Sequence, residues 1–203
     1  YEELLASHPK SPLRLEASYG RAWATYKLNQ ADRAIELLTD PTGGFQIASQ
    51  TSTNETKIVE GNLLLADVLL TRKRFRETEA VLEELGKRAL RPEQNFDRLY
   101  LLASSTFADL RTDEALARVT NLVAYTISPA GRPVWYANAL MLKAEIFRGR
   151  EPAAAIGIYE EIARIAGVPK NQTRQAVMKM VQVIQEQNQL TNAVQRLDGF
   201  LRE

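Results

Sequence analysis

The amino-acid sequence predicts an all-α fold, a solenoid in which antiparallel helix pairs stack on one another. Apolar residues recur at spacings of three and four, and helix-breaking residues separate the segments that carry them. The alternation of apolar and polar residues that would indicate β-strands is absent. Because short helix pairs bury their apolar faces only against neighbouring pairs, we expect these pairs to form a stacked array.

A pair of small residues recurs along the chain and marks the repeats. Ala22 lies twelve positions before Ala34, with a polar turn between them. The spacing returns, exactly or nearly, in Ala66 and Thr78, Ala103 and Ala115, Ala144 and Ala155, and Val181 and Ala193. A small residue on each helix lets the two backbones approach closely, while larger side chains fill the space around the contact.

The repeats divide the chain into about five helix pairs in a single domain, 1–203. We expect the pairs at 11–39, 52–89, 92–127, 132–167 and 169–202, with the end of an earlier repeat at 1–10. Helix starts are indicated by Ser11-Pro12, Pro92, Pro152, Thr112 and a capping box of Ser52 with Glu55. The start at Tyr1, inside the first of these segments, predicts a fragment of a longer chain.

Two stretches depart from the amphipathic pattern. Residues 58–70 are apolar nearly all the way round, which predicts an inner helix covered on several sides. The stretch DPTGGFQIASQTS, 40–52, is expected to be a surface loop that Phe45 and Ile47 pin to the helices. Its two glycines do not form a phosphate-binding loop, since no lysine follows them and no strand precedes them.

The composition excludes several classes of function. The 203 residues are 45% hydrophobic and carry a net charge of +1, so no overall field favours nucleic acid or an anionic membrane. The sequence has no cysteine and one histidine, His8, which excludes thiol chemistry, a serine–histidine triad and two-histidine metal sites. No apolar stretch is long enough to insert into a membrane. We therefore expect no cofactor, no metal and no enzymatic activity.

A basic run, RKRFR at 72–76, is the one feature that favours nucleic acid. With Lys87, Arg88 and Arg91 downstream, it fits a phosphate-contacting patch. Glutamates follow it closely, so a solvated turn is the preferred interpretation. A repeat protein that binds nucleic acid stays open as an alternative.

The stretches AWATYKLNQADRAIELL, LLLADVLLTRKRFRETEAVLEEL, LLASSTFADLRTDEALARV and AIGIYEEIA resemble tetratricopeptide (TPR) repeats. The family's small residue within the first helix is matched by Ala22, Ala66 and Ala103, and its alanine opening the second helix by Ala34, Ala115, Ala155 and Ala193. Thr78 replaces one alanine, and Gly149 alone keeps the glycine of the turn. The resemblance implies a right-handed superhelix whose first helices line a concave face.

The junction YEELLASHPKSPLRLEASYGRAW is similar to one branch of the family, the bacterial cell-envelope members. These include the periplasmic protein associated with the Tol-Pal system and the outer-membrane assembly lipoprotein. The resemblance implies a location in the periplasm or cell envelope.

The resemblance also places a set of side chains on the concave face, where partners of the family bind. Projected onto this sequence they are Tyr19, Trp23, Lys27, Asp67, Tyr100, Ser104, Phe107, Glu145 and Arg148. Aromatic and arginine side chains are frequent binding hot spots, although the aromatic residues here also fit packing between helices. The expected function is a non-catalytic scaffold that binds a peptide or protein segment. A helical domain attached to a catalytic domain outside this sequence is the second alternative.

Overall fold

The computed structural model describes residues 3, 7–8, 11–127, 132–187 and 199, and every regular element in these residues is an α-helix. The chain divides into two compact units, Tyr1–Asp109 and Leu110–Glu203. The division falls between the two helices expected for the pair at 92–127. Whether all repeats form one domain stays a prediction.

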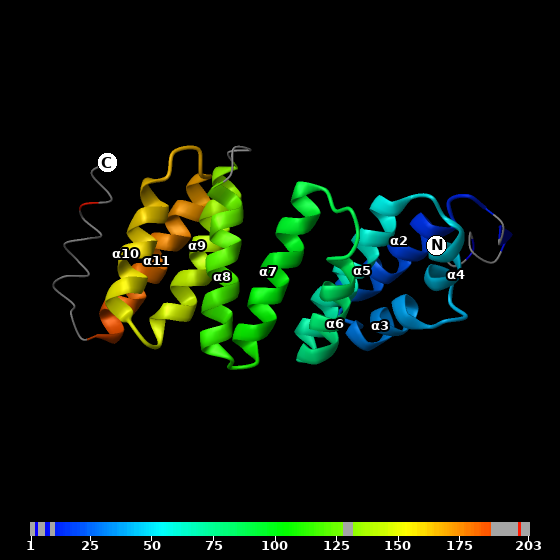
Figure 1. Cartoon of the computed structure of the whole chain (residues 1–203), viewed down its shortest axis with the longest axis horizontal. Helices are drawn as coiled ribbons and strands as arrows, with labels where there is room; N and C mark the ends of the chain where they lie inside the picture. The colour runs from blue at the N-terminus through cyan, green and yellow to red at the C-terminus, as the bar shows by residue number, and fades with distance from the viewer. Residues whose placement is uncertain (1–2, 4–6, 9–10, 128–131, 188–198, 200–203) are drawn as a thin grey trace. The chain divides into compact units, whose positions relative to one another are not determined.

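Unit 1 consists of three first helices and the shorter helices packed beside them (Figure 1). Its helices are α2 (Arg14–Lys27), α3 (Ala31–Thr39), α4 (Gly44–Thr51), α5 (Glu55–Thr71), α6 (Phe75–Leu85) and α7 (Pro92–Ala108). Helix α2 packs against α3, and α5 packs against α6, as expected for helix pairs. The first helices also contact one another, α2 with α5 and α5 with α7.

Unit 2 repeats this arrangement. It consists of α8 (Thr112–Ile127), α9 (Pro133–Arg148), α10 (Pro152–Arg164) and α11 (Lys170–Glu186). Helix α10 packs against both α9 and α11, and α8 packs against α9. Ala193 and the rest of the expected last helix, like most of 1–10, lie outside the described residues.

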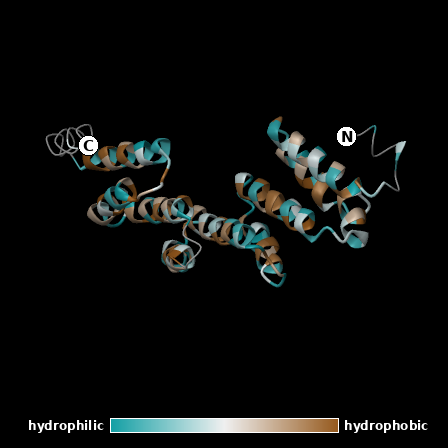
Figure 2. Cartoon of the chain, turned by 90° about the horizontal axis from the view of Figure 1, so that it is seen from above, coloured by the Kyte–Doolittle hydropathy of each residue, from teal (hydrophilic) through white to brown (hydrophobic). Residues whose placement is uncertain are grey.

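The small residues of the repeat are buried, as the sequence predicts. All eight members of the four clear pairs, from Ala22 and Ala34 to Ala144 and Ala155, have 0% exposed surface. Larger side chains surround them, including Leu38 in unit 1 and Tyr159 in unit 2, both also 0% exposed. Apolar and polar residues alternate around most helices (Figure 2), as expected for helices that bury one side.

The expected loop at 40–52 is wrong, because residues 44–51 form helix α4. Phe45 is buried with 1% of its surface exposed, whereas Ile47 is 37% exposed and does not pin the segment. The Gln46 side chain donates a hydrogen bond to the Leu38 carbonyl oxygen at 2.5 Å. Helix α4 therefore packs on α2 and α3, with Phe45 and Ala48 buried and the Gln46 amide bonded to the end of α3.

The helix starts agree with most of the sequence signals. Pro92 and Pro152 occupy the first turns of α7 and α10, and α8 begins at Thr112. The expected capping box at Ser52 is wrong, since Asn54 caps α5 by accepting a hydrogen bond from the Lys57 amide at 3.1 Å. An asparagine accepts this bond as readily as a serine does.

The turns after α2, α5 and α7 use the left-handed backbone conformation without glycine. Asn29, Lys73 and Leu110 have φ angles of 61°, 58° and 63°. Asparagine tolerates this conformation, but lysine and leucine adopt it at a cost of about 1–2 kcal/mol. These three turns therefore keep the left-handed conformation that glycine would favour, although other residues occupy them.

We predict that Gly61→Ala destabilises the protein, because Gly61 on α5 is covered by the ring of Phe45. A Cβ atom at Gly61 would lie 2.2 Å from Cζ of Phe45. Overpacking of this kind typically costs about 1–3 kcal/mol. Gly157→Ala in α10 is the matched control, since a Cβ there meets no atom within 4 Å. It should instead stabilise by roughly 0.5–1 kcal/mol through helix propensity. Equal effects of the two variants on urea unfolding would contradict the packing of α4.

Candidate functional site

A groove of about 340 Å³ opens on the first helices of unit 1. Three successive first helices line it, with Tyr19 and Trp23 from α2, Glu60, Leu63, Leu64 and Asp67 from α5, and Asp97, Tyr100 and Leu101 from α7. Within each helix most of these residues are three or four positions apart, a spacing that puts them on one side of the helix. The small residues Ala22, Ala66 and Ala103 on the same helices are fully buried and do not line the groove.

The aromatic side chains of the groove are partly open to solvent. Trp23 keeps 46% of its surface exposed, although its neighbour Ala22 is fully buried. Tyr100 is supported from beneath by the buried ring of Phe96, with ring centroids 6.0 Å apart. Of the two interpretations of Trp23, an open surface ring fits the structure better than a core residue.

Two lysines beside the groove lie over its aromatic rings. The Lys57 ammonium is 4.5 Å from the centre of the Tyr19 ring, and the Lys27 ammonium is 5.5 Å from that of Trp23. Such distances allow cation–π attraction. The aromatic wall of the groove therefore already attracts ammonium groups of the chain itself.

The groove also contains three carboxylates, which differ in their surroundings. Glu60 pairs with the Lys57 ammonium at 2.5 Å and with the Arg91 guanidinium at 3.7 Å. Burial raises the pKa of Asp67, although a hydrogen bond from Tyr26 and the charge of Lys27 act to lower it. Asp97 is more exposed. Partial burial of its carboxyl, together with the nearby negative charge of Glu93, raises its pKa.

The structure brings together four of the nine residues predicted from the sequence. Tyr19, Trp23, Asp67 and Tyr100 line the groove, and Lys27 lies beside it. Ser104 and Phe107 are half-buried further along α7 and do not line it. Sequence reasoning missed five lining residues, of which Glu60 lies seven positions before Asp67 and Asp97 three before Tyr100. Helical spacing from the predicted residues would have found both.

Glu145 and Arg148 belong to unit 2, where they join neighbouring helices to one another. Glu145 on α9 accepts hydrogen bonds from the Tyr159 hydroxyl at 2.7 Å and the Lys179 ammonium at 2.5 Å. The Arg148 Nε donates to Glu186 at 3.0 Å. Burial acts to raise the pKa of Glu145, but these donors hold it below its ordinary value. Both side chains therefore act in the packing of α9, α10 and α11.

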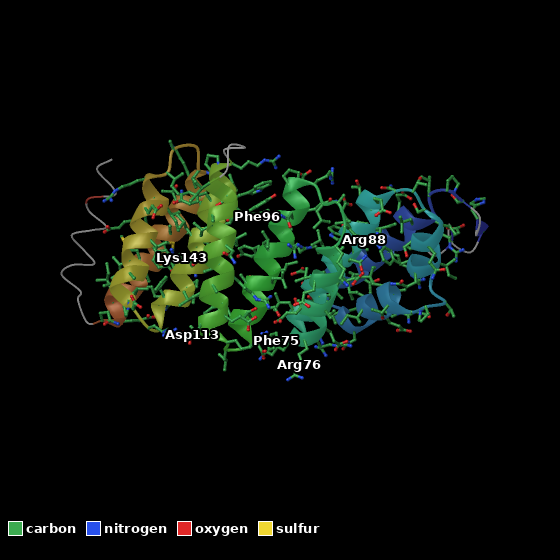
Figure 3. The ribbon with its side chains drawn as sticks, viewed as in Figure 1. Phe75, Arg76, Arg88, Phe96, Asp113 and Lys143 are labelled. Atoms are coloured by element: carbon green, nitrogen blue, oxygen red, sulfur yellow. The ribbon has the colours of Figure 1, made fainter. Side chains whose placement is uncertain are left out.

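Most cations of the basic segment are paired with carboxylates. Arg72 meets Asp32 at 2.9 Å, and Arg74 meets Glu77 at 2.6 Å. Arg88 (Figure 3) reaches Glu55 at 2.8 Å, and Lys87 reaches Glu84 at 2.5 Å. Arg76 is exposed and projects away from the ribbon in the same view. The segment is thus a surface of ion pairs and not an open basic patch.

The described residues contain no arrangement that indicates metal chemistry or membrane insertion. No three histidine, cysteine, aspartate or glutamate side chains among them gather closely enough to hold a metal ion. In the same part of the chain, none of the helices combines the length and hydropathy needed to cross a bilayer.

We predict that Asp67→Asn raises the melting temperature at pH 7. The raised pKa means that the folded state disfavours the carboxylate, so ionisation lowers stability once the pH has risen through that pKa. The gain should therefore shrink toward pH 3, where the folded-state carboxyl is protonated. Glu84→Gln is the control of opposite sign, since Lys87 holds the pKa of Glu84 below its ordinary value. A lower melting temperature for Asp67→Asn at pH 7 would contradict this account.

The structure is similar to solved TPR-like repeat proteins, whereas no protein-family model and no curated protein sequence matches the chain. A kinesin-light-chain-like protein of Podosopora anserina with nearly identical TPR-like repeats superposes with a TM-score of 0.71 at 17% identity, covering 95% of this chain and 96% of that one. A variant of it gives 0.72 at 18% identity, covering 94% of both chains. A Rap protein complexed with Competence and Sporulation Factor gives 0.71 at 14% identity. The match covers 94% of this chain and 54% of the Rap chain. The predicted all-α repeat fold is confirmed, and it is the fold of TPR-like repeats.

Proposed function

We propose that this chain is a non-catalytic protein-interaction scaffold whose unit 1 groove binds an extended segment of another protein. The observation that carries the proposal is the groove itself, in which three successive first helices present aromatic, apolar and acidic side chains on one open face. Repeated helices present equivalent positions side by side, so an extended ligand meets each helix in turn. Its volume of about 340 Å³ suits one or two side chains of such a segment.

The exposure of Trp23 supports a binding role. Tryptophan is the residue most enriched among binding hot spots, where a partner covers the ring and removes it from water. Trp23 is 46% exposed in the free chain, so it has surface available to bury. A solved protein of the same fold, the Rap protein, is complexed with Competence and Sporulation Factor, which agrees with a fold that holds partners.

The two alternative functions receive less support. Nucleic-acid binding requires cations that are free to contact phosphates, and four of the basic residues between 72 and 88 are held in ion pairs. A catalytic domain elsewhere in a longer protein would leave the groove's role as a binding surface unchanged. The sequence of the full-length gene decides that question.

We further propose that the scaffold works in the bacterial cell envelope, in the assembly of other envelope proteins. The proposal rests on the junction around His8 and Pro12, which is similar to that of the envelope branch. Fractionation of cells that express the epitope-tagged full-length protein tests it. Recovery of the protein in the periplasmic or membrane fraction is expected, and recovery in the cytoplasm alone would overturn it.

We predict that Trp23→Ala weakens binding of a groove ligand by about 2 kcal/mol or more, roughly 30-fold in Kd. Suitable ligands are peptides selected against the full chain from a randomised twelve-residue library, measured by fluorescence anisotropy. Because Trp23 is exposed, the loss of stability should stay well below the roughly 3–5 kcal/mol of a buried tryptophan.

Trp135→Ala, which alters the other tryptophan of the chain, is the matched control. Trp135 lies on α9 in unit 2 and packs against the Arg132 guanidinium, 4.1 Å from the ring centre. We expect this variant to bind the peptides as the wild type does. If Trp23→Ala folds and keeps full affinity for every selected peptide, the groove is not the binding site.

A further inference from the structure

The lining of the unit 1 groove is acidic, with three carboxylates and no lysine or arginine. An imbalance of this kind disfavours anionic ligands and favours cationic ones. Which carboxylates are available to a ligand depends on the partners that each has within the chain.

Glu60 is already neutralised by its own neighbours. Lys57, one turn before it on α5, binds it at 2.5 Å, and Arg91 approaches from the start of α7 at 3.7 Å. A ligand would have to displace these cations in order to pair with Glu60. The charge of the groove that is open to a ligand therefore lies elsewhere.

Asp67 and Asp97 have no such partner. Neither carboxylate forms an ion pair with any cation of the described residues, and Asp97 faces a charge of the same sign on Glu93. Asp67 interacts with the charge of Lys27 without forming an ion pair, and it accepts a hydrogen bond from Tyr26. The two carboxylates come from different helices, α5 and α7, and line the same groove. Both carboxylates are therefore open to a cation that enters the groove.

The apolar part of the groove suits the stem of a long basic side chain. Leu63, Leu101 and the aromatic rings provide surface for methylene groups, which lysine and arginine bury while keeping the charged end near polar groups. The rings also attract cations, as the positions of Lys27 and Lys57 over Trp23 and Tyr19 demonstrate.

We propose that the groove selects a segment carrying a lysine or arginine, whose cation pairs with Asp67 and Asp97 and whose stem lies on the aromatic and leucine side chains. This inference rests on the proposed scaffold function and adds the chemistry of the ligand. It also gives the two unpaired carboxylates a role, since a bound cation relieves the cost of holding them partly away from water.

The test uses the full chain and the randomised twelve-residue peptide library. Peptides that bind the wild type should be enriched in lysine and arginine relative to the unselected library. For a selected peptide, replacing the enriched basic residue by glutamine should weaken binding by about tenfold, as measured by anisotropy. On a double variant, Asp67→Asn with Asp97→Asn, the same replacement should have little effect, because the cation has then lost its partners.

Glu83→Gln is the matched control, because it removes one exposed carboxylate of unit 1 on α6 that does not line the groove. This variant should keep the preference for basic peptides. Selected peptides that need Trp23 but show no preference for lysine or arginine would overturn this inference and leave the scaffold proposal standing. A selection that yields no binding peptide would overturn both.

Discussion

The packing of paired helices at fully buried small residues constrains where the other side chains of a repeat can lie. Ala22 and Ala34 of the first pair, like Ala66 and Thr78 of the second, have no exposed surface, and the helices that carry them pack against each other. Once that side of a first helix is fixed against its partner, the residues one or two positions away point toward the neighbouring first helices or into solvent. The groove on α2, α5 and α7 includes four such residues, Trp23, Leu64, Asp67 and Leu101.

The same constraint explains how the groove can hold an exposed aromatic ring and a carboxylate without an ion-pair partner. Trp23 follows Ala22 directly, and Asp67 follows Ala66, so each lies beside a buried alanine while facing away from the helix pair. The alanine contacts secure the helices, and an exposed ring or an unpaired carboxylate at the next position therefore does not disrupt them. Function commonly retains residues that lower stability. Burial raises the pKa of Asp67, so we expect Asp67 to be such a residue.

Much of the fold could be predicted from the sequence because its signals are local. The twelve-residue spacing and the prolines at Pro92 and Pro152 depend only on neighbouring residues, and the structure agrees with them. Helix α4 was missed because two glycines and several polar residues weaken its pattern, and its position depends on the space that Gly61 leaves for Phe45. That space comes from a residue sixteen positions later and leaves no local signal.

The site could be predicted only in part, for a similar reason. Tyr19, Trp23, Asp67 and Tyr100 follow from the inward positions of the repeat, whereas Glu145 and Arg148 occupy equivalent positions but are paired with Lys179 and Glu186. Those partners lie 34 and 38 residues later in the chain. A single sequence shows which residues face inward, but not which of them the next helix neutralises.

The fluorescence of Trp23 offers the most direct measurement of whether this groove is a binding surface. A Trp135→Phe variant leaves Trp23 as the sole tryptophan of the chain. Titration with a groove-selected peptide that lacks tryptophan should shift the emission of Trp23 to shorter wavelength and protect it from acrylamide, because the partner covers its exposed 46%. Saturable binding of the peptide with unchanged emission and unchanged quenching would contradict the account.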